Sequence, residues 1–115
     1  MSFIYEDICR EKILDLSHEG VMDFTISRSG KWWDKTEEID IVALSEAEHK
    51  ILLGECNYTE KKVDADVYYT LKEKSKKVKW LPQALNYYFI FSKSGFTDTL
   101  LYLAERDPYL YLLKT

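Results

Sequence analysis

The chain has 115 residues, which is enough for one compact domain with a single core and too few for separate catalytic and regulatory domains. Its 46% hydrophobic and 15% aromatic content excludes a disordered chain, and no apolar run approaches the ~20 residues of a membrane span, which predicts a soluble, cytoplasmic protein. The formal charge of −4 argues against a dedicated nucleic-acid binder, although five lysines between positions 72 and 79 make one segment locally basic.

The first predicted element is an amphipathic helix over residues 3–17, where apolar side chains recur at helical spacing and Gly20 follows as a stop signal. Glu6 lies at the edge of the apolar stripe of this helix. An acid in a first turn ordinarily does no more than interact favourably with the helix dipole, and this is the simplest interpretation of Glu6 considered alone.

A half-buried strand is predicted over residues 21–27, because apolar and polar residues alternate there. Residues 28–31, with Gly30 among them, predict a turn after this strand. Trp32 and Trp33 follow directly and must point to different sides of an extended chain, so one is expected in the core and the other at the rim.

Two apolar runs, residues 39–44 and 51–56, predict a β-hairpin because they have the length and β-branched content of strands and are joined by a polar loop. Each run contains one carboxylate, Asp40 in the first and Glu55 in the second. Since side chains alternate across a strand, Asp40 is expected on the same face as Val42.

The register of this hairpin decides whether the two acids meet. If Leu44 lies opposite Ile51, the antiparallel register places Asp40 opposite Glu55. Like charges so placed on an apolar face are destabilising, so the pair needs a compensating partner. A divalent cation such as Mg²⁺, a lysine salt bridge or a shared proton would each compensate it.

A second helix, capped by Asp64 or Asp66, is predicted to run to about residue 78. Leu71 lies on its apolar stripe, and Lys74 lies at the edge of that stripe. The ammonium group of Lys74 can therefore reach inward while most of the neighbouring lysines face water.

The rest of the chain predicts a central strand over residues 85–91, which are almost continuously apolar, then a short helix capped by Thr97 or Asp98 and a last strand over residues 109–113. The complete predicted order is α-β-β-β-α-β-α-β. Neither a phosphate-binding loop nor a pair of closely spaced cysteines occurs in the sequence, so we expect no ATP site and no zinc site. Cys9 and Cys56 are expected to be reduced, buried thiols.

The predicted order and the acidic hairpin resemble the PD-(D/E)xK nuclease superfamily. Asp40 matches the first acid of that superfamily, and Glu55-Cys56-Asn57 falls where it has (D/E)-x-K. Glu6 resembles the acid on the first helix of the branched-DNA resolvase relatives. The resemblance implies an α/β, restriction-endonuclease-like core in which helices flank a central mixed sheet.

Nearly the whole chain is also similar to a domain of unknown function found at the C-terminal end of archaeal-type, AAA-like ATPases. The matching landmarks are Trp32-Trp33-Asp34 and residues 38–44, 53–56, 71–75 and 91–96. This implies that residues 1–115 are a single nuclease-like domain, as the C-terminal domain or a fragment of a larger ATPase. Its expected partners are DNA and an ATPase domain in the same chain or in a partner chain.

The resemblance also implies the site residues. Asp40 and Glu55 would hold one or two Mg²⁺ or Mn²⁺ ions with the backbone carbonyl of Cys56, and Glu6 would add a ligand. Asn57 departs from the family, which commonly has a lysine there, because an amide supplies no positive charge. Lys74 is the expected replacement.

Lys61, which is close to the hairpin in sequence, is the second candidate for this replacement. Three functions stay open at this point: a metal-dependent nuclease; a nuclease-like module with weakened or lost catalysis that binds nucleic acid or a protein partner; and buried acids that lysines hold without any metal. Asn57 and the acidic overall charge favour the second. The many Tyr and Trp side chains are compatible with a homodimer.

Overall fold

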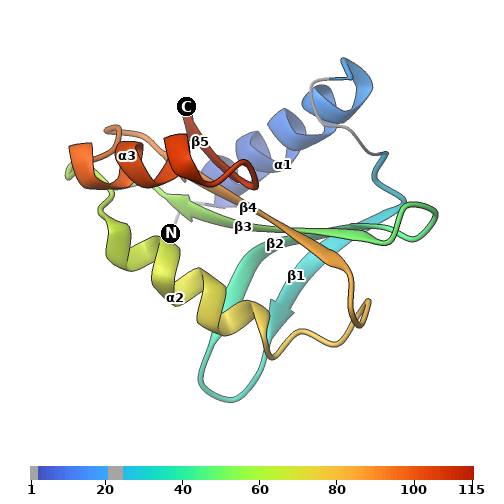
Figure 1. The fold of residues 1–115 in the computed structure, drawn as a ribbon. Helices are drawn as coiled ribbons and strands as arrows, with labels where there is room; N and C mark the ends of the chain where they lie inside the picture. The colour runs from blue at the N-terminus through green and yellow to red at the C-terminus, as the bar shows by residue number, and fades with distance from the viewer. Residues whose placement is uncertain (1–2, 21–24) are drawn as a thin grey trace.

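A computed structural model describes residues 3–20 and 25–115 of the chain (Figure 1). The elements in these residues, in chain order, are α1 (Phe3–His18), β1 (Arg28–Trp33), β2 (Glu38–Ser45), β3 (Lys50–Asn57), α2 (Ala65–Ser75), β4 (Leu85–Ser92), α3 (Asp98–Arg106) and β5 (Leu110–Lys114). Their order is the one that the sequence predicts. Among the described helices, none has the length and apolar character needed to cross a membrane.

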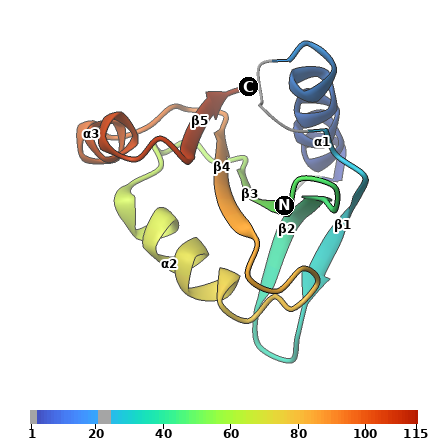
Figure 2. The same ribbon diagram turned by 45° about the vertical axis from the view of Figure 1, so that its right-hand side comes forward.

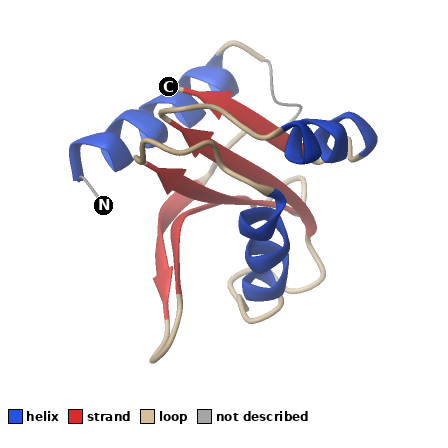
Figure 3. Cartoon of the chain, turned by 90° about the vertical axis from the view of Figure 1, so that its left-hand side faces the viewer, coloured by secondary structure: helices blue, strands red, loops and turns tan. Residues whose placement is uncertain are grey.

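The strands form one mixed sheet in the order β1-β2-β3-β4-β5. Strand β2 is antiparallel to both β1 and β3, whereas β4 is parallel to both β3 and β5. Parallel neighbours need a crossover connection, which α2 and α3 provide. Both of these helices lie on one face of the sheet and α1 lies on the other (Figures 2 and 3).

The sheet divides the core into two clusters of buried side chains. The cluster under α2 and α3 includes Leu53, Leu71 and Ile90, whereas the cluster under α1 includes Ile41 and Phe89. Successive residues of β4 thus contribute to opposite clusters. This explains why the sequence of β4 is apolar almost throughout, as predicted for a strand that is covered on both faces.

The helix boundaries follow local capping interactions. The Asp64 carboxylate accepts a hydrogen bond of 2.7 Å from the backbone N–H of Ala65 at the start of α2, and Thr97 caps α3. The second helix ends at Ser75, three residues before the predicted end. There the backbone N–H groups of Lys76, Lys77 and Val78 each bond to a carbonyl three residues back, which tightens the chain into a turn.

The first strand lies later than predicted. Residues 21–24 of the predicted strand lie outside the described residues, residues 25–27 are not strand, and the predicted turn at residues 28–31 belongs to β1. Gly30 lies inside this edge strand and pairs with Val42. The ring of Trp80 packs over it, at a distance that leaves ordinary van der Waals room for a Cβ atom.

The two adjacent tryptophans are arranged as predicted. Trp32 is 9% exposed and packs in the cluster under α2, whereas Trp33 is 68% exposed. Because Trp32 faces α2, the preceding residue of β1, Lys31, faces α1.

Candidate active site

The predicted register of the acidic hairpin is confirmed for Leu44 with Ile51 and for Val42 with Leu53, but the ladder does not extend to the predicted pair of Asp40 and Glu55. The β2–β3 ladder ends where Ile41 lies opposite Gly54. Beyond this pair, the backbone N–H of Cys56 donates a 2.9 Å hydrogen bond to Oδ2 of Asp40. A carboxylate thus satisfies the backbone of β3 at the point where the ladder stops.

The predicted face of Asp40 is wrong, because β2 contains a bulge. Gly30 pairs with Val42, but Trp32 pairs with Ile39, so β2 has one residue more than β1 between the two pairs. As a result Ile39, and not Asp40, packs with Val42 under α2. A bulge re-aims the side chains within it. Asp40 is only 3% exposed, and its carboxylate lies beside the backbone of β3 instead of on the apolar face.

Glu55 and Lys74 form a partly buried ion pair between β3 and α2. Nζ of Lys74 lies 3.1 Å from Oε1 of Glu55, whose side chain is 15% exposed. The same ammonium group donates a 2.9 Å hydrogen bond to the backbone carbonyl of Glu38. The expectation that Lys74 reaches inward is therefore confirmed, and its two contacts attach α2 to both strands of the hairpin.

The pKa of Glu55 reports the charge balance at this pair. Burial raises this pKa to about 7, the neighbouring Asp40 carboxylate raises it as well, and Lys74 opposes both effects. Burial, more than the charge of Asp40, thus favours the protonated form of Glu55. When both acids are ionised, Asp40 and Glu55 carry two negative charges against the single positive charge of Lys74.

A second lysine lies on the α1 side of the sheet. Nζ of Lys31 is 3.8 Å from Oε1 of Glu6 and 3.6 Å from Oε2 of Glu38. Burial lowers the pKa of Lys31, but the carboxylates of Glu6, Glu38 and Asp40 outweigh it and raise that pKa above its ordinary value. The sequence analysis missed Lys31, because a turn at residues 28–31 would have left it outside the sheet.

Cys56 turns its side chain away from the two acids. Its thiol is fully buried in the cluster under α1, together with Cys9, and both cysteines are free thiols as predicted. The contact with Cys9 and burial raise the pKa of the Cys56 thiol, so it stays protonated. The backbone carbonyl is therefore the atom of Cys56 that is suited to a metal.

Asn57 is engaged by the backbone of β4, since its side-chain amide donates a 3.2 Å hydrogen bond to the carbonyl of Phe91. With Glu55 and Lys74, Asn57 lines a cavity of about 160 Å³, whose other lining residues are Asp66, Val67 and Thr70. This volume is below the ~300 Å³ at which small-molecule pockets begin. The cavity is therefore large enough only for part of a larger molecule.

Asp66, expected only as a possible helix cap, and Thr70 were not predicted as site residues. Asp66, Thr70 and Lys74 follow one another at intervals of four residues, so they share one face of α2. This spacing is the sequence signal that identifies Asp66 and Thr70. Lys61, the second candidate for the missing lysine, is exposed in the loop before α2, where its carbonyl accepts a hydrogen bond from Thr59.

Of the expected metal set, the carboxylates of Asp40 and Glu55 interact with each other. Across residues 3–20 and 25–115, no three His, Cys, Asp or Glu side chains gather in an arrangement that could hold a metal ion. Glu6 is engaged with Lys31 on the α1 side. The structure brings Asp40, Glu55 and Lys74 together and places Glu6 apart from Glu55.

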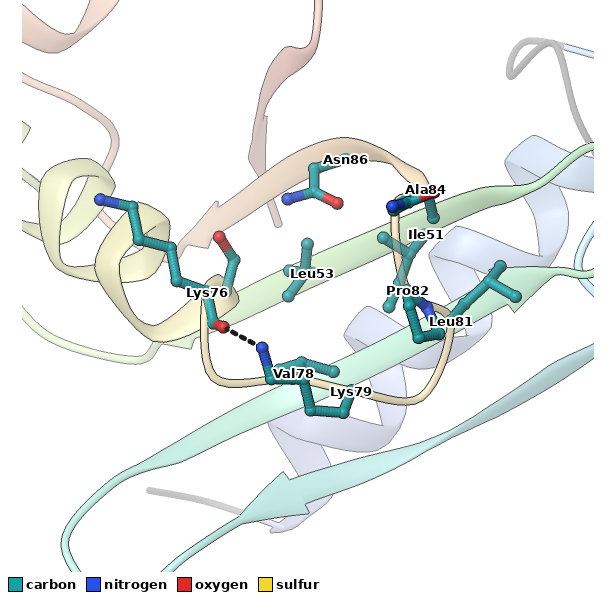
Figure 4. Close-up of a pocket in the computed structure, with 11 residues that line it drawn as sticks. Ile51, Leu53, Lys76, Val78, Lys79, Leu81, Pro82, Ala84 and Asn86 are labelled. Atoms are coloured by element: carbon teal, nitrogen blue, oxygen red, sulfur yellow. Dashed lines mark hydrogen bonds between the residues drawn. The ribbon is translucent and has the colours of Figure 1, made fainter.

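A larger cavity of about 330 Å³ lies between β3 and the connection from α2 to β4 (Figure 4). Its walls include Ile51, Leu53, Val78 and Pro82, and the backbone N–H of Val78 donates to the carbonyl of Ser75 beside it. The acids described above do not line it. This cavity is separate from the candidate site.

The chain is similar to proteins of archaea and bacteria. Residues 1–78 match the model of the DUF234 family, described as archaea bacterial proteins of unknown function. An uncharacterized protein of Methanocaldococcus jannaschii is 33% identical over 96 residues, which cover 81% of this chain and 21% of that protein. The chain thus spans about a fifth of the length of this relative.

The fold is similar to that in the crystal structure of a repair endonuclease from Pyrococcus abyssi. The TM-score is 0.62 at 13% sequence identity, and the match covers 100% of this chain and 47% of that chain. The mixed sheet flanked by helices is therefore a restriction-endonuclease-like fold, as the sequence resemblance implies.

Proposed function

The chain belongs to the DUF234 family, and from this premise and its nuclease-like fold we propose that it is a divalent-cation-dependent nuclease domain with Asp40, Glu55 and Lys74 at its active site. One observation carries the proposal: the ammonium group of Lys74 lies 3.1 Å from a Glu55 carboxylate that borders Asp40. Lys74 thereby supplies from α2 the positive charge that Asn57 does not supply from β3.

The residues at this site fit Mg²⁺ or Mn²⁺. Asp40 and Glu55 offer the hard oxygen donors that these ions prefer, and when both are ionised they carry one more charge than Lys74 balances. In this proposal Asp40, Glu55 and the backbone carbonyl of Cys56 hold the ion. When bound, such an ion lowers the pKa of a water molecule and neutralises charge on a phosphate.

Lys74 is held in place before any substrate arrives. Its hydrogen bond to the carbonyl of Glu38 and its ion pair with Glu55 fix the ammonium group at the wall of the 160 Å³ cavity. From there it can orient the attacking water and stabilise charge on the phosphate. Loss of one such preorganised group typically lowers the rate by ~10²–10³.

The first test is a calorimetric titration of the protein with Mn²⁺. Asp40→Asn keeps an oxygen that can accept the hydrogen bond from Cys56 but removes the charge, so we expect it to weaken Mn²⁺ binding at least ten-fold. Glu60→Gln is the matched control, because Glu60 is an exposed acid that pairs with Lys93 outside the site. Equal binding by wild type and Asp40→Asn, or no binding by wild type, would refute the metal site.

The second test is cleavage of DNA in the presence of Mn²⁺. We expect Lys74→Ala to lower the cleavage rate by ~10²–10³, because the substitution removes a preorganised charge. Lys61→Ala is the control, since Lys61 is exposed and lies outside the residues that line the cavity. Cleavage that survives unchanged in Lys74→Ala would show that this lysine has no catalytic role.

The hydrogen bond of Asn57 to Phe91 favours a second function, a nuclease-like module with weakened or lost catalysis that binds nucleic acid or a protein partner. In that case fluorescence anisotropy would detect binding to DNA without cleavage. Asn57→Lys would then raise cleavage, because it restores a positive charge at the family position. A protein that neither binds nor cleaves DNA would leave a protein partner as the ligand.

We also propose that the domain works beside an ATPase domain, in the same chain or in a partner chain. The match to only 21% of the Methanocaldococcus jannaschii relative supports a role within a longer protein. The test is to measure ATP hydrolysis by that full-length relative with and without the segment that matches this chain. A relative that hydrolyses no ATP would argue against the association.

A further inference from the structure

Two lysines divide the acids around Asp40 between the two faces of the sheet. Lys74 holds Glu55 on the α2 side, and Lys31 lies 3.8 Å from Glu6 on the α1 side. Glu38 connects the two lysines, since its carboxylate is 3.6 Å from Lys31 and its backbone carbonyl accepts a hydrogen bond from Lys74. Asp40 interacts electrostatically with Lys31 and Glu55, so the four acids and two lysines form one connected set.

Glu6 is the most enclosed partner in these ion pairs. Its side chain is 7% exposed, compared with 15% for Glu55 and 30% for Lys31. A carboxylate buried to this extent needs a cation beside it. The structure supplies that cation as the ammonium group of Lys31, from an edge strand whose Gly30–Trp32 register shift sets the direction of Lys31.

We propose that Lys31 takes the place of a second divalent cation beside Glu6, so that the site binds one divalent ion, at Asp40 and Glu55. This inference rests on the proposed metal-dependent function and specifies its stoichiometry. It makes Lys31 a positioning residue that holds Glu6 and Glu38 away from the bound ion.

The charges of the set agree with one ion. When all are ionised, the carboxylates of Glu6, Glu38, Asp40 and Glu55 exceed the two ammonium groups by two negative charges, which a single divalent cation balances. With Lys31 in place, a second divalent ion would leave two net positive charges in this set, and without Lys31 it would leave one, so Lys31 disfavours the second ion.

The experiment is a calorimetric Mn²⁺ titration that measures ions bound per chain, at a pH above the pKa of Glu55. We expect one ion for wild type and two for Lys31→Met, in which Glu6 and Asp40 are freed from the ammonium group. Methionine keeps an unbranched apolar stem of similar length. Lys35→Met, the same change at an exposed lysine in the β1–β2 turn, should bind one ion.

A double variant identifies the acid that binds the second ion. Lys31→Met combined with Glu6→Gln should return the stoichiometry to one, because the freed carboxylate is removed. Thermal unfolding gives an independent measurement: without metal, Lys31→Met should melt below wild type, and Mn²⁺ should raise its melting temperature more than that of wild type. If Lys31→Met folds only in Mn²⁺, refolding with two ions per chain supports the proposal.

The outcomes separate this inference from the proposed function. The single-ion inference is overturned if wild type binds two ions. It is also overturned if Lys31→Met binds one ion and shows the same melting response to Mn²⁺ as wild type. Both outcomes leave the metal site in place. Failure of Lys31→Met to refold at any Mn²⁺ concentration overturns it too. If neither wild type nor any variant binds Mn²⁺, the proposed metal site itself is refuted. If only Lys31→Met binds Mn²⁺, Lys31 blocks the whole site.

Discussion

At the scale of single residues, Glu55 makes the stability of the metal-free protein depend on pH. Its pKa is raised from 4.5 to about 7 in the folded state, first by burial and then by Asp40. Between these two pH values the folded protein holds a proton that the unfolded chain has released, so the unfolding free energy falls as pH rises. The stabilisation is complete below about pH 4.5 and is lost as pH rises through about 7.

The size of this loss follows from the pKa change. One pKa unit corresponds to ~1.4 kcal/mol, so we expect wild type to lose up to about 3 kcal/mol relative to Glu55→Gln across this pH range. The measurement is urea unfolding of both proteins at several pH values in the presence of a chelator. Parallel pH profiles for the two proteins would mean that Glu55 does not keep its proton in the folded state.

How far the site residues could be predicted depends on how local their causes are. The proximity of Asp40, Glu55 and Lys74 follows from strand pairing and helical spacing, which the sequence displays directly. The bulge at Asp40 does not, because it depends on how β1 and β2 match each other and not on the pattern within either strand. Lys31 escaped prediction for the same reason.

At the scale of elements, the caps of α2 and α3 are linked. Thr97 caps α3 by accepting a 3.3 Å hydrogen bond from the N–H of Leu100, and its hydroxyl donates a 2.8 Å hydrogen bond to Asp64, the cap of α2. We expect Thr97→Ala to lower the unfolding free energy by about 1 kcal/mol, the usual cost of a lost cap. Chemical denaturation measures this loss.

A double-mutant cycle tests the link between the two caps. If Asp64 and Thr97 act together, Asp64→Ala combined with Thr97→Ala should destabilise the protein by less than the sum of the single changes. Thr97→Ser is the control, since serine keeps the hydroxyl group. Additive losses would show that the two helices are capped independently.

Most elements could be predicted because their sequences show a clear hydrophobic periodicity or a capping residue. The hairpin, α2 and β4 combine buried apolar residues with clear ends. β1 is different: it is an edge strand of largely polar residues with a glycine inside it, and such a sequence is also typical of a turn. Pairing with β2 decides the outcome, and this is a tertiary effect.

At the scale of the whole molecule, the family match and the folding unit have different ends. The match ends at residue 78, but β4 lies beyond it, between β3 and β5, and buries Phe89, Ile90 and Phe91 completely. A fragment of residues 1–78 would expose one edge of β3 and open both core clusters. We expect this fragment not to unfold cooperatively.

Circular dichroism during heating checks this expectation. The full chain should show one sigmoidal transition, and residues 1–78 should show a gradual, non-cooperative change with binding of a hydrophobic dye at low temperature. A cooperative transition in the fragment would mean that the antiparallel half of the sheet with α1 and α2 is a folding unit by itself.

The hydrogen bond from Cys56 to Asp40 has a consequence for how this family can change over evolutionary time. Asp40 holds the two strands of the hairpin together where their backbone ladder ends, and it does so whether or not the protein cuts DNA. A descendant that abandoned catalysis would still be under selection for an oxygen acceptor at this position, and drift from Asp to Asn would cost its fold little. Glu55 instead contacts the ammonium group of Lys74, so the joint retention of this charged pair is the better guide to which relatives are active enzymes.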